Sequence, residues 1–172
     1  NMNRRQMANS EVKITQPSGW IEQLQAAIAQ ARNEVLFALT EPSAFPSLGC
    51  LAVVQTLRAL LHEHSHAKVL FLVDSVGSIR QVWPRFVQAA QWYSHQMQIQ
   101  IVDASLERQY DVCAVDRSWV AYAPLRDTAR NSEVWRCSPI AGNPVATYAM
   151  EEALEALKRS QLSTWSPVGL PG

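Results

Sequence analysis

Helical and strand-like segments alternate along the first two thirds of the chain, and this alternation restricts the possible folds more than any other feature. The helical segments repeat apolar residues every three or four positions, while the strand segments are short and rich in β-branched and aromatic residues. We expect helices at residues 20–32, 51–64 and 78–97, and strands at residues 34–40, 67–74 and 98–104. Such alternation implies right-handed crossovers and a largely parallel sheet covered by helices.

The pattern changes after residue 104. The segment DVCAVDRSWVAYAP, residues 111–124, predicts two strands that a tight turn joins, and these must be antiparallel. Apolar residues occupy both faces of the first of these strands, as is typical of a central strand. Residues 132–138 predict a further strand, and residues 142–160 predict a last helix with Asn143 as its N-cap and Pro144 in its first turn. The sequence therefore predicts an α/β fold with a mixed, largely parallel sheet flanked by helices.

The chain has 172 residues, enough for one domain with a sizeable hydrophobic core. We expect a flexible arm at residues 1–16, one α/β domain at residues 17–160 and an irregular, Pro/Gly-rich tail at residues 161–172. No apolar run approaches 18 residues, and no apolar stretch follows the basic N-terminal residues. Neither a membrane span nor a secretory signal is therefore expected.

The cysteine residues carry little functional signal. They are three in number, without CxxC spacing, at Cys50, Cys113 and Cys137. Neither a zinc knuckle nor a disulfide framework fits this pattern, and we interpret Cys113 as a small buried hydrophobic residue. Free thiols without a secretory signal favour the cytoplasm.

Charge argues against nucleic acid as the main partner. Lys and Arg number 15, as do Asp and Glu, so the formal net charge is zero. Proteins that bind nucleic acid usually have a basic excess, because neutralising phosphates supplies much of their affinity. For the same reason we interpret the six tryptophans as core or interface residues rather than as base-stacking residues.

Three alternate histidines, His62, His64 and His66, form the most metal-like pattern. On a helix, His64 would point about 160° away from His66, and no nearby carboxylate–histidine group completes a zinc site. We interpret these histidines as a polar helix terminus, and expect neither a metal site nor a cofactor.

Polar residues follow two of the expected strands and offer a candidate ligand site. These residues are Glu41 after the first strand, then Asp74, Ser75 and Arg80 after the second. Ligands of α/β proteins bind where parallel strands end, so Glu41 and Asp74 are expected to be neighbours there. Paired carboxylates can perform acid–base catalysis, and this predicts a hydrolase or phosphodiesterase-type enzyme as one alternative.

Four arginines near the expected hairpin offer a third possibility, an anion-binding or nucleic-acid-binding module. They are Arg108, Arg117, Arg126 and Arg130.

The order of elements over residues 19–160 resembles one half of the phospholipase D fold. The segments GWIEQLQAAIAQARNEVLFAL and VVQTLRALLHEHSHAKVLFLVD are similar to the opening helix–strand units of that superfamily, and VDRSWVAYAPL to a later strand region. The resemblance implies a small bacterial domain. It also implies a homodimer, because half-size members pair to complete a site.

The signature of that superfamily is H-x-K-x-x-x-x-D, in which the histidine is the nucleophile and the lysine clamps the phosphate. Aligning its aspartate with Asp116 places Gln109 at the histidine position and Asp111 at the lysine position. A glutamine amide cannot act as the nucleophile, and an aspartate would repel the phosphate. The sequence therefore favours a non-catalytic phospholipase D-like domain, a pseudoenzyme that acts by binding or association.

Overall fold

The computed structural model describes six stretches of the chain. These are residues 10–16, 19–40, 46–73, 79–102, 107–125 and 134–162. The elements are β1 (Val12–Ile14), α2 (Gly19–Ala29), β2 (Glu34–Leu39), the 3₁₀ helix η2 (Pro46–Gly49), α3 (Leu51–Glu63), β3 (Lys68–Val73), α4 (Ile79–Val82), α5 (Pro84–Trp92), β4 (Met97–Ile101), β5 (Tyr110–Val115), β6 (Trp119–Pro124), β7 (Trp135–Pro139), α6 (Pro144–Lys158) and β8 (Gln161–Leu162).

The described strands form one sheet of eight strands in the order β1-β7-β6-β5-β2-β3-β4-β8. β2, β3 and β4 pair in parallel, while the other neighbouring pairs are antiparallel. The mixed sheet flanked by helices is confirmed. Parallel pairing is less extensive than expected, because the later part of the chain adds its strands as antiparallel neighbours.

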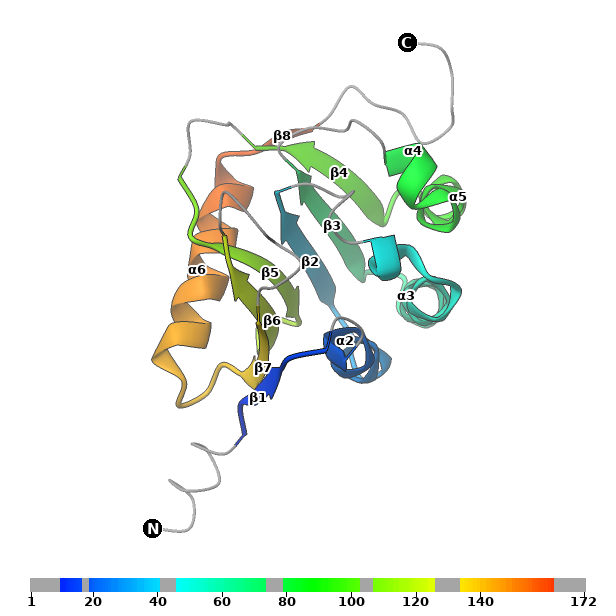
Figure 1. Cartoon of the computed structure of the whole chain (residues 1–172). Helices are drawn as coiled ribbons and strands as arrows, with labels where there is room; N and C mark the ends of the chain where they lie inside the picture. Colours follow the sequence, from blue (N-terminus) through cyan, green and yellow to red (C-terminus); the bar gives the residue numbers. More distant parts are fainter. Residues whose placement is uncertain are drawn as a thin grey trace.

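Helices cover both faces of the sheet and give the molecule three layers (Figure 1). α2, α3, α4 and α5 lie against one face, and α6 lies against the other, where it packs on β5 and β6. α3 connects β2 to β3, and α4 with α5 connects β3 to β4, so both parallel crossovers pass over the same face. Helices that cross over the sheet between parallel strands are what the alternation of segments predicts.

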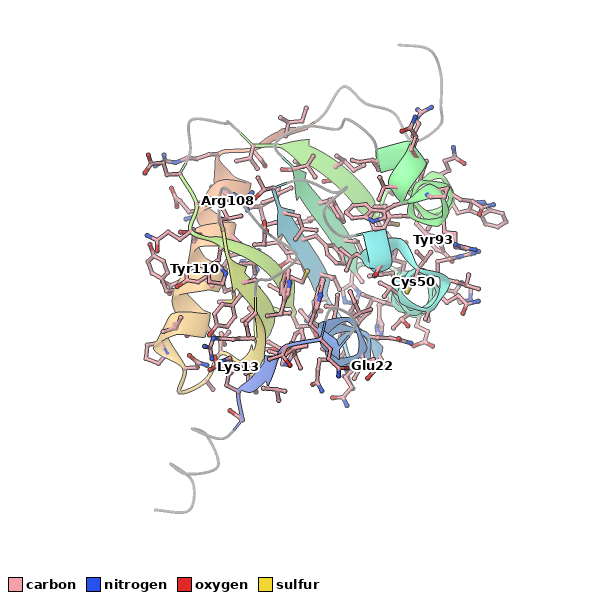
Figure 2. The ribbon with its side chains drawn as sticks, viewed as in Figure 1. Lys13, Glu22, Cys50, Tyr93, Arg108 and Tyr110 are labelled. Carbon is pink, nitrogen blue, oxygen red and sulfur yellow. The ribbon has the colours of Figure 1, made fainter. Side chains whose placement is uncertain are left out.

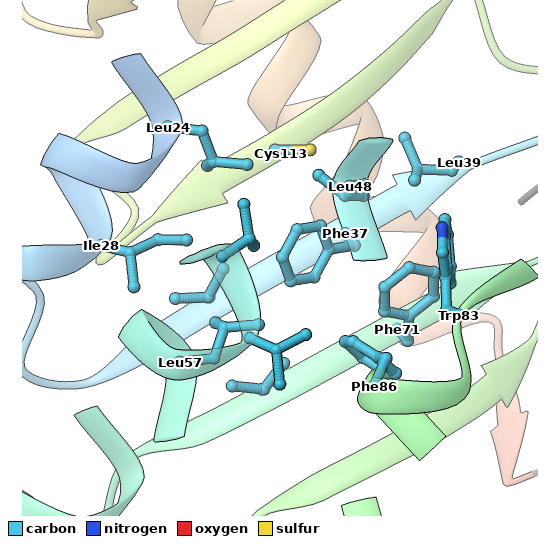
Figure 3. Packing of buried hydrophobic residues seen from close by; sticks show 14 of the residues in the cluster. Leu24, Ile28, Phe37, Leu39, Leu48, Leu57, Phe71, Trp83, Phe86 and Cys113 are labelled. Carbon is cyan, nitrogen blue, oxygen red and sulfur yellow. The ribbon is translucent and has the colours of Figure 1, made fainter. Parts of the chain in front are cut away.

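The larger of two apolar cores fills the space between the sheet and α2–α5. Phe37 of β2 and Phe71 of β3 stack with ring centroids 4.9 Å apart, and Phe86 of α5 meets both rings edge-on (Figure 3). Trp83 closes this core next to η2. A Cβ atom added to Gly49 would lie only 2.2 Å from Cδ1 of Trp83, so the close approach of the indole requires glycine at this position.

The second core lies between the sheet and α6. Alternation along β2 divides its side chains between the two cores, with Phe37 on one side and Leu36 and Ala38 on the other. β5 is likewise buried on both faces, and Cys113 has no exposed surface. The predicted central strand and the buried Cys113 are both confirmed.

The β5–β6 hairpin turns at residues 116–118, as predicted. The backbone N–H of Ser118 donates to the carbonyl of Val115 over 3.0 Å. Asp116 and Arg117 have φ angles of 52° and 55°, in the left-handed region that most non-glycine residues avoid. A turn with positive φ at both central positions matches the twist of the paired strands.

The single helix expected at residues 78–97 is divided into two. Pro84 begins α5, and the non-helical residue Trp83 separates it from the short α4. Asn143 is the N-cap of α6, and its side-chain oxygen accepts a hydrogen bond of 3.1 Å from the backbone N–H of Ala146.

The sheet extends into both segments that we expected to lie outside the domain. β1 pairs with β7 within the expected arm of residues 1–16, and β8 pairs with β4 within the expected tail of residues 161–172. Both strands are edge strands of only three and two residues. They are too short to show a period-two pattern, so the sequence does not indicate them.

Candidate functional site

Gln109 and Asp111 lie at the start of β5, next to the carboxyl end of β2. Ala38 pairs with Val112, so Asp111 comes level with the end of β2. Leu39 pairs with Val73, and β3 therefore ends at the same edge. Because ligands of α/β proteins bind at the carboxyl ends of parallel strands, this edge is the candidate site.

Asp111 is buried at this edge, with 2% of its surface exposed. Its Oδ1 accepts hydrogen bonds from the backbone N–H of Thr40 at 2.9 Å and from Thr40 Oγ1 at 3.0 Å. The carboxylate thus joins the start of β5 to the end of β2. At this position it offers acceptors rather than donors, and it cannot clamp a phosphate as a lysine would.

Gln109 has an exposed side chain, while its backbone is anchored to α6. Oε1 of Glu152 accepts hydrogen bonds from the N–H groups of Gln109 at 2.8 Å and Tyr110 at 3.0 Å. Figure 2 shows Arg108 and Tyr110 beside α6 at this start of β5. Sequence reasoning missed Glu152, since nothing local distinguishes it from the exposed Glu151.

Asp116 lies at the opposite end of β5 and has a structural role. Its Oδ1 accepts from the N–H groups of Asn33 at 2.8 Å and Glu34 at 2.9 Å, and its Oδ2 accepts from Arg32 at 2.9 Å. Desolvation alone would raise the pKa of Asp116, but these hydrogen bonds and the nearby His64 together lower it. The aspartate of the motif position therefore fastens the hairpin to the start of β2.

Arg108 and Arg117, two of the four arginines expected to bind an anion near the hairpin, lie at opposite ends of β5. Arg108 precedes β5 and Arg117 follows it, so about 30 Å of extended chain separates them. Arg117 forms an ion pair with Glu34, with Nε 3.0 Å from Oε2. Arg126 and Arg130 lie outside the described residues.

The acid–base site proposed at the strand ends falls largely outside the described residues. Glu41, Asp74 and Ser75 are all beyond them, although β2 and β3, which they follow, end side by side as expected. Arg80 lies exposed on α4, on the chain segment that follows β3.

The histidines adopt a different arrangement from the helical one considered for them. α3 ends at Glu63, and His64 is extended, with φ −125° and ψ 98°. The rings of His64 and His66 lie 6.2 Å apart at their centroids. Across the described stretches, no group of three or more His, Cys, Asp or Glu side chains is arranged to hold a metal ion.

Glu11 forms a polar cluster that the sequence did not indicate. Its carboxylate accepts hydrogen bonds from Tyr122 Oη at 2.5 Å and Asn143 Nδ2 at 3.0 Å, and Arg136 Nη1 lies 3.4 Å away. Desolvation opposes ionisation, but these three groups together lower the pKa of Glu11. The cluster ties the N-terminal segment to β6, β7 and the first turn of α6.

Of the two roles expected for the tryptophans, core or interface packing, Trp92 does not fill the first. Trp20 and Trp135 do, stacking with centroids 3.9 Å apart and planes inclined by 6°. Trp92, the last residue of α5, is instead 71% exposed, and the guanidinium of Arg58 lies 5.4 Å from its ring centroid.

Solved structures with the same arrangement include two chains of nearly equal length. NucT from Helicobacter pylori matches with a TM-score of 0.60 and 10% identity, over 89% of this chain and 98% of that one. Nuc from Salmonella typhimurium, a phospholipase D family member, matches with a TM-score of 0.57 and 13% identity, over 90% and 97%. The fold is therefore phospholipase D-like, as the sequence resemblance implied.

A third similar structure is that of TrmBL2, an archaeal chromatin protein with a novel mode of DNA binding. It matches with a TM-score of 0.62 and 13% identity, over 90% of this chain and 55% of that one. The chain thus spans about half the length of TrmBL2. No family model and no curated protein sequence matches the chain. Within the described parts of the chain, no helix combines the length and the apolar character needed to cross a bilayer.

Proposed function

We propose that this chain is a phospholipase D-like domain that acts by binding or association and lacks the phosphodiester chemistry of that superfamily. The observation that supports this most strongly is the buried carboxylate of Asp111, which is hydrogen-bonded to Thr40. The alignment of the motif on Asp116 assigns Asp111 to the position of the phosphate-clamping lysine. The exposed amide of Gln109, two residues earlier, cannot form a phosphoenzyme intermediate.

An assay of phosphodiester hydrolysis tests the proposal. Bis(p-nitrophenyl) phosphate and a labelled oligonucleotide are incubated with the protein, with Gln109→Ala, with Asp111→Asn, and with the exposed-site control Lys158→Gln. We expect the same background turnover in all four preparations. The proposal is refuted if the starting protein and Lys158→Gln hydrolyse a substrate and either Gln109→Ala or Asp111→Asn does not.

Nucleic acid is a second candidate ligand, and one specific observation favours it. TrmBL2, which has a similar fold, is described by its mode of DNA binding. A gel shift at low and moderate salt tests this function, since contacts to phosphates weaken as salt rises. A shift that is absent at low salt would exclude it.

The remaining sequence-based expectations stay predictions. The hydrolase alternative with Glu41, Asp74, Ser75 and Arg80, the homodimer, the bacterial origin and the cytoplasmic location all belong here. Sedimentation at rising protein concentration tests the homodimer, and a single monomeric species throughout would refute it.

A further inference from the structure

The neutral overall charge conceals an uneven distribution between the two helical layers. The described helices α3, α4 and α5 carry three arginines and one carboxylate, namely Arg58, Arg80, Arg85 and Glu63, and α2 on the same face of the sheet carries one glutamate. On the opposite face of the sheet, α6 carries three glutamates and one lysine. The outer surface of α3–α5 is therefore basic, although the net charge of the chain is zero.

An exposed aromatic ring lies within this basic surface. Arg58 of α3 sits over the ring of Trp92, so the two helices present an indole and a guanidinium side by side. Arg85 precedes Trp92 by seven residues on α5, which places both on one side of that helix. Leu51, seven residues before Arg58 on α3, is 51% exposed and continues the same stripe. Among the described residues, neither Arg58 nor Arg85 has an ion-pair partner.

We propose that this surface, formed by Leu51, Arg58, Arg85 and Trp92, binds single-stranded nucleic acid. The proposal rests on the binding function proposed above and names its partner and its site. A base stacks on the part of the indole that Arg58 leaves uncovered, while the two arginines neutralise neighbouring phosphates. An acidic peptide could form ion pairs with the arginines, but its carboxylates would not stack on the indole, which is 71% exposed. The surface lies away from the start of β5 and does not need the motif residues.

Fluorescence anisotropy of labelled dT12, rU12 and a 12-base-pair duplex tests the site. We expect the single strands to bind. The logarithm of the binding constant should fall with the logarithm of the salt concentration with a slope of about −1.4, for two phosphate contacts. Trp92→Ala should weaken binding roughly 5- to 100-fold, because it removes base stacking. Trp92→Phe should keep most of the affinity, and Arg85→Gln should make the salt slope shallower by about 0.7.

One variant on α6 and one at its C-cap are matched controls. Tyr148→Ala removes a half-exposed aromatic side chain, and Arg159→Gln removes an exposed arginine, both on the other face of the sheet. Neither should change the affinity. Absence of binding at 50 mM salt, or equal affinities of Trp92→Ala and Tyr148→Ala, would overturn the proposal. The proposal would also be overturned if the protein binds no oligonucleotide but self-associates, and if Trp92→Ala abolishes that self-association. The surface would then bind a second copy of the chain.

The same samples separate this proposal from the non-catalytic function. If the oligonucleotide is bound at Trp92 and also cut, the non-catalytic function fails while the surface stands. If the oligonucleotide is neither bound nor cut, the surface fails while the non-catalytic function stands.

Discussion

Asp116 provides a quantitative test of how the hairpin is held. Its carboxylate accepts three backbone N–H groups from Arg32, Asn33 and Glu34 at 2.8–2.9 Å. A hydrogen bond to a charged group contributes about 1.5 kcal/mol at the low end, so three would give about 4.5 kcal/mol. Two of the three are exposed to solvent, where water replaces part of this energy. We expect Asp116→Gly to destabilise the fold by about 2–4 kcal/mol.

Three substitutions separate hydrogen bonding from backbone strain at this position. Glycine adopts the φ of 52° without strain, whereas alanine there adds a further cost of about 1 kcal/mol, so Asp116→Ala should be the least stable variant. Asp116→Asn tolerates the same φ and keeps the acceptor for Asn33 and Glu34. It loses only the hydrogen bond from Arg32, and should cost about 1–2 kcal/mol.

The pH dependence of stability gives an independent check. The folded-state pKa of Asp116 is lowered, so its stabilisation is present above the unfolded-state pKa of about 3.9 and is lost as pH falls through the folded-state pKa. Urea unfolding at pH 7 and at pH 3 should therefore show a smaller acid-induced loss in Asp116→Asn than in the starting protein. Glu11, whose pKa is also lowered, contributes to the loss that remains.

The reasoning is refuted if Asp116→Gly unfolds within about 0.5 kcal/mol of the starting protein at pH 7, the range expected for an ordinary surface substitution. It is also refuted if Asp116→Asn and the starting protein lose equal stability between pH 7 and pH 3.

Two further predictions concern buried positions. Gly49→Ala should destabilise the protein by about 1–3 kcal/mol, measured by urea unfolding, because the added methyl group overlaps the Trp83 indole; an unchanged midpoint would contradict this contact. Burial, with a smaller contribution from Glu11, raises the pKa of the Cys137 thiol to about 12, and burial raises that of Cys113 as well. Both should resist Ellman's reagent at pH 8 until urea is added, and rapid labelling of all three thiols in the folded protein would contradict their burial.

The sequence predicted the elements whose signal is local and missed what depends on distant contacts. β2, β3 and β5 are short, continuous apolar runs, which is typical of buried strands. Asn143 followed by Pro144 is a strong signal for the start of a helix. Arg108 and Arg117 were grouped because they are close in the sequence. The extended strand β5 lies between them and places them far apart.

The polar contacts of the candidate site could not be read from local patterns. Glu11 is hydrogen-bonded to Tyr122, 111 residues away in the sequence, and Thr40 to Asp111, 71 residues away. Such pairs exist only after the sheet has assembled. Trp92 differs from these pairs, because its position seven residues after the exposed Arg85 already places it on the exposed side of α5.

The position of β5 between β2 and β6 affects how this chain emerges from the ribosome. Val35 of β2 pairs with Val115 of β5, 80 positions later, whereas β3 can pair with β2, and β4 with β3, much sooner. At about 5–20 residues per second, the free edge of β2 waits roughly 4–16 seconds for its partner. During that interval an apolar strand edge is open to pairing with other nascent chains, so the demand for chaperones should be greatest just before the hairpin is synthesised.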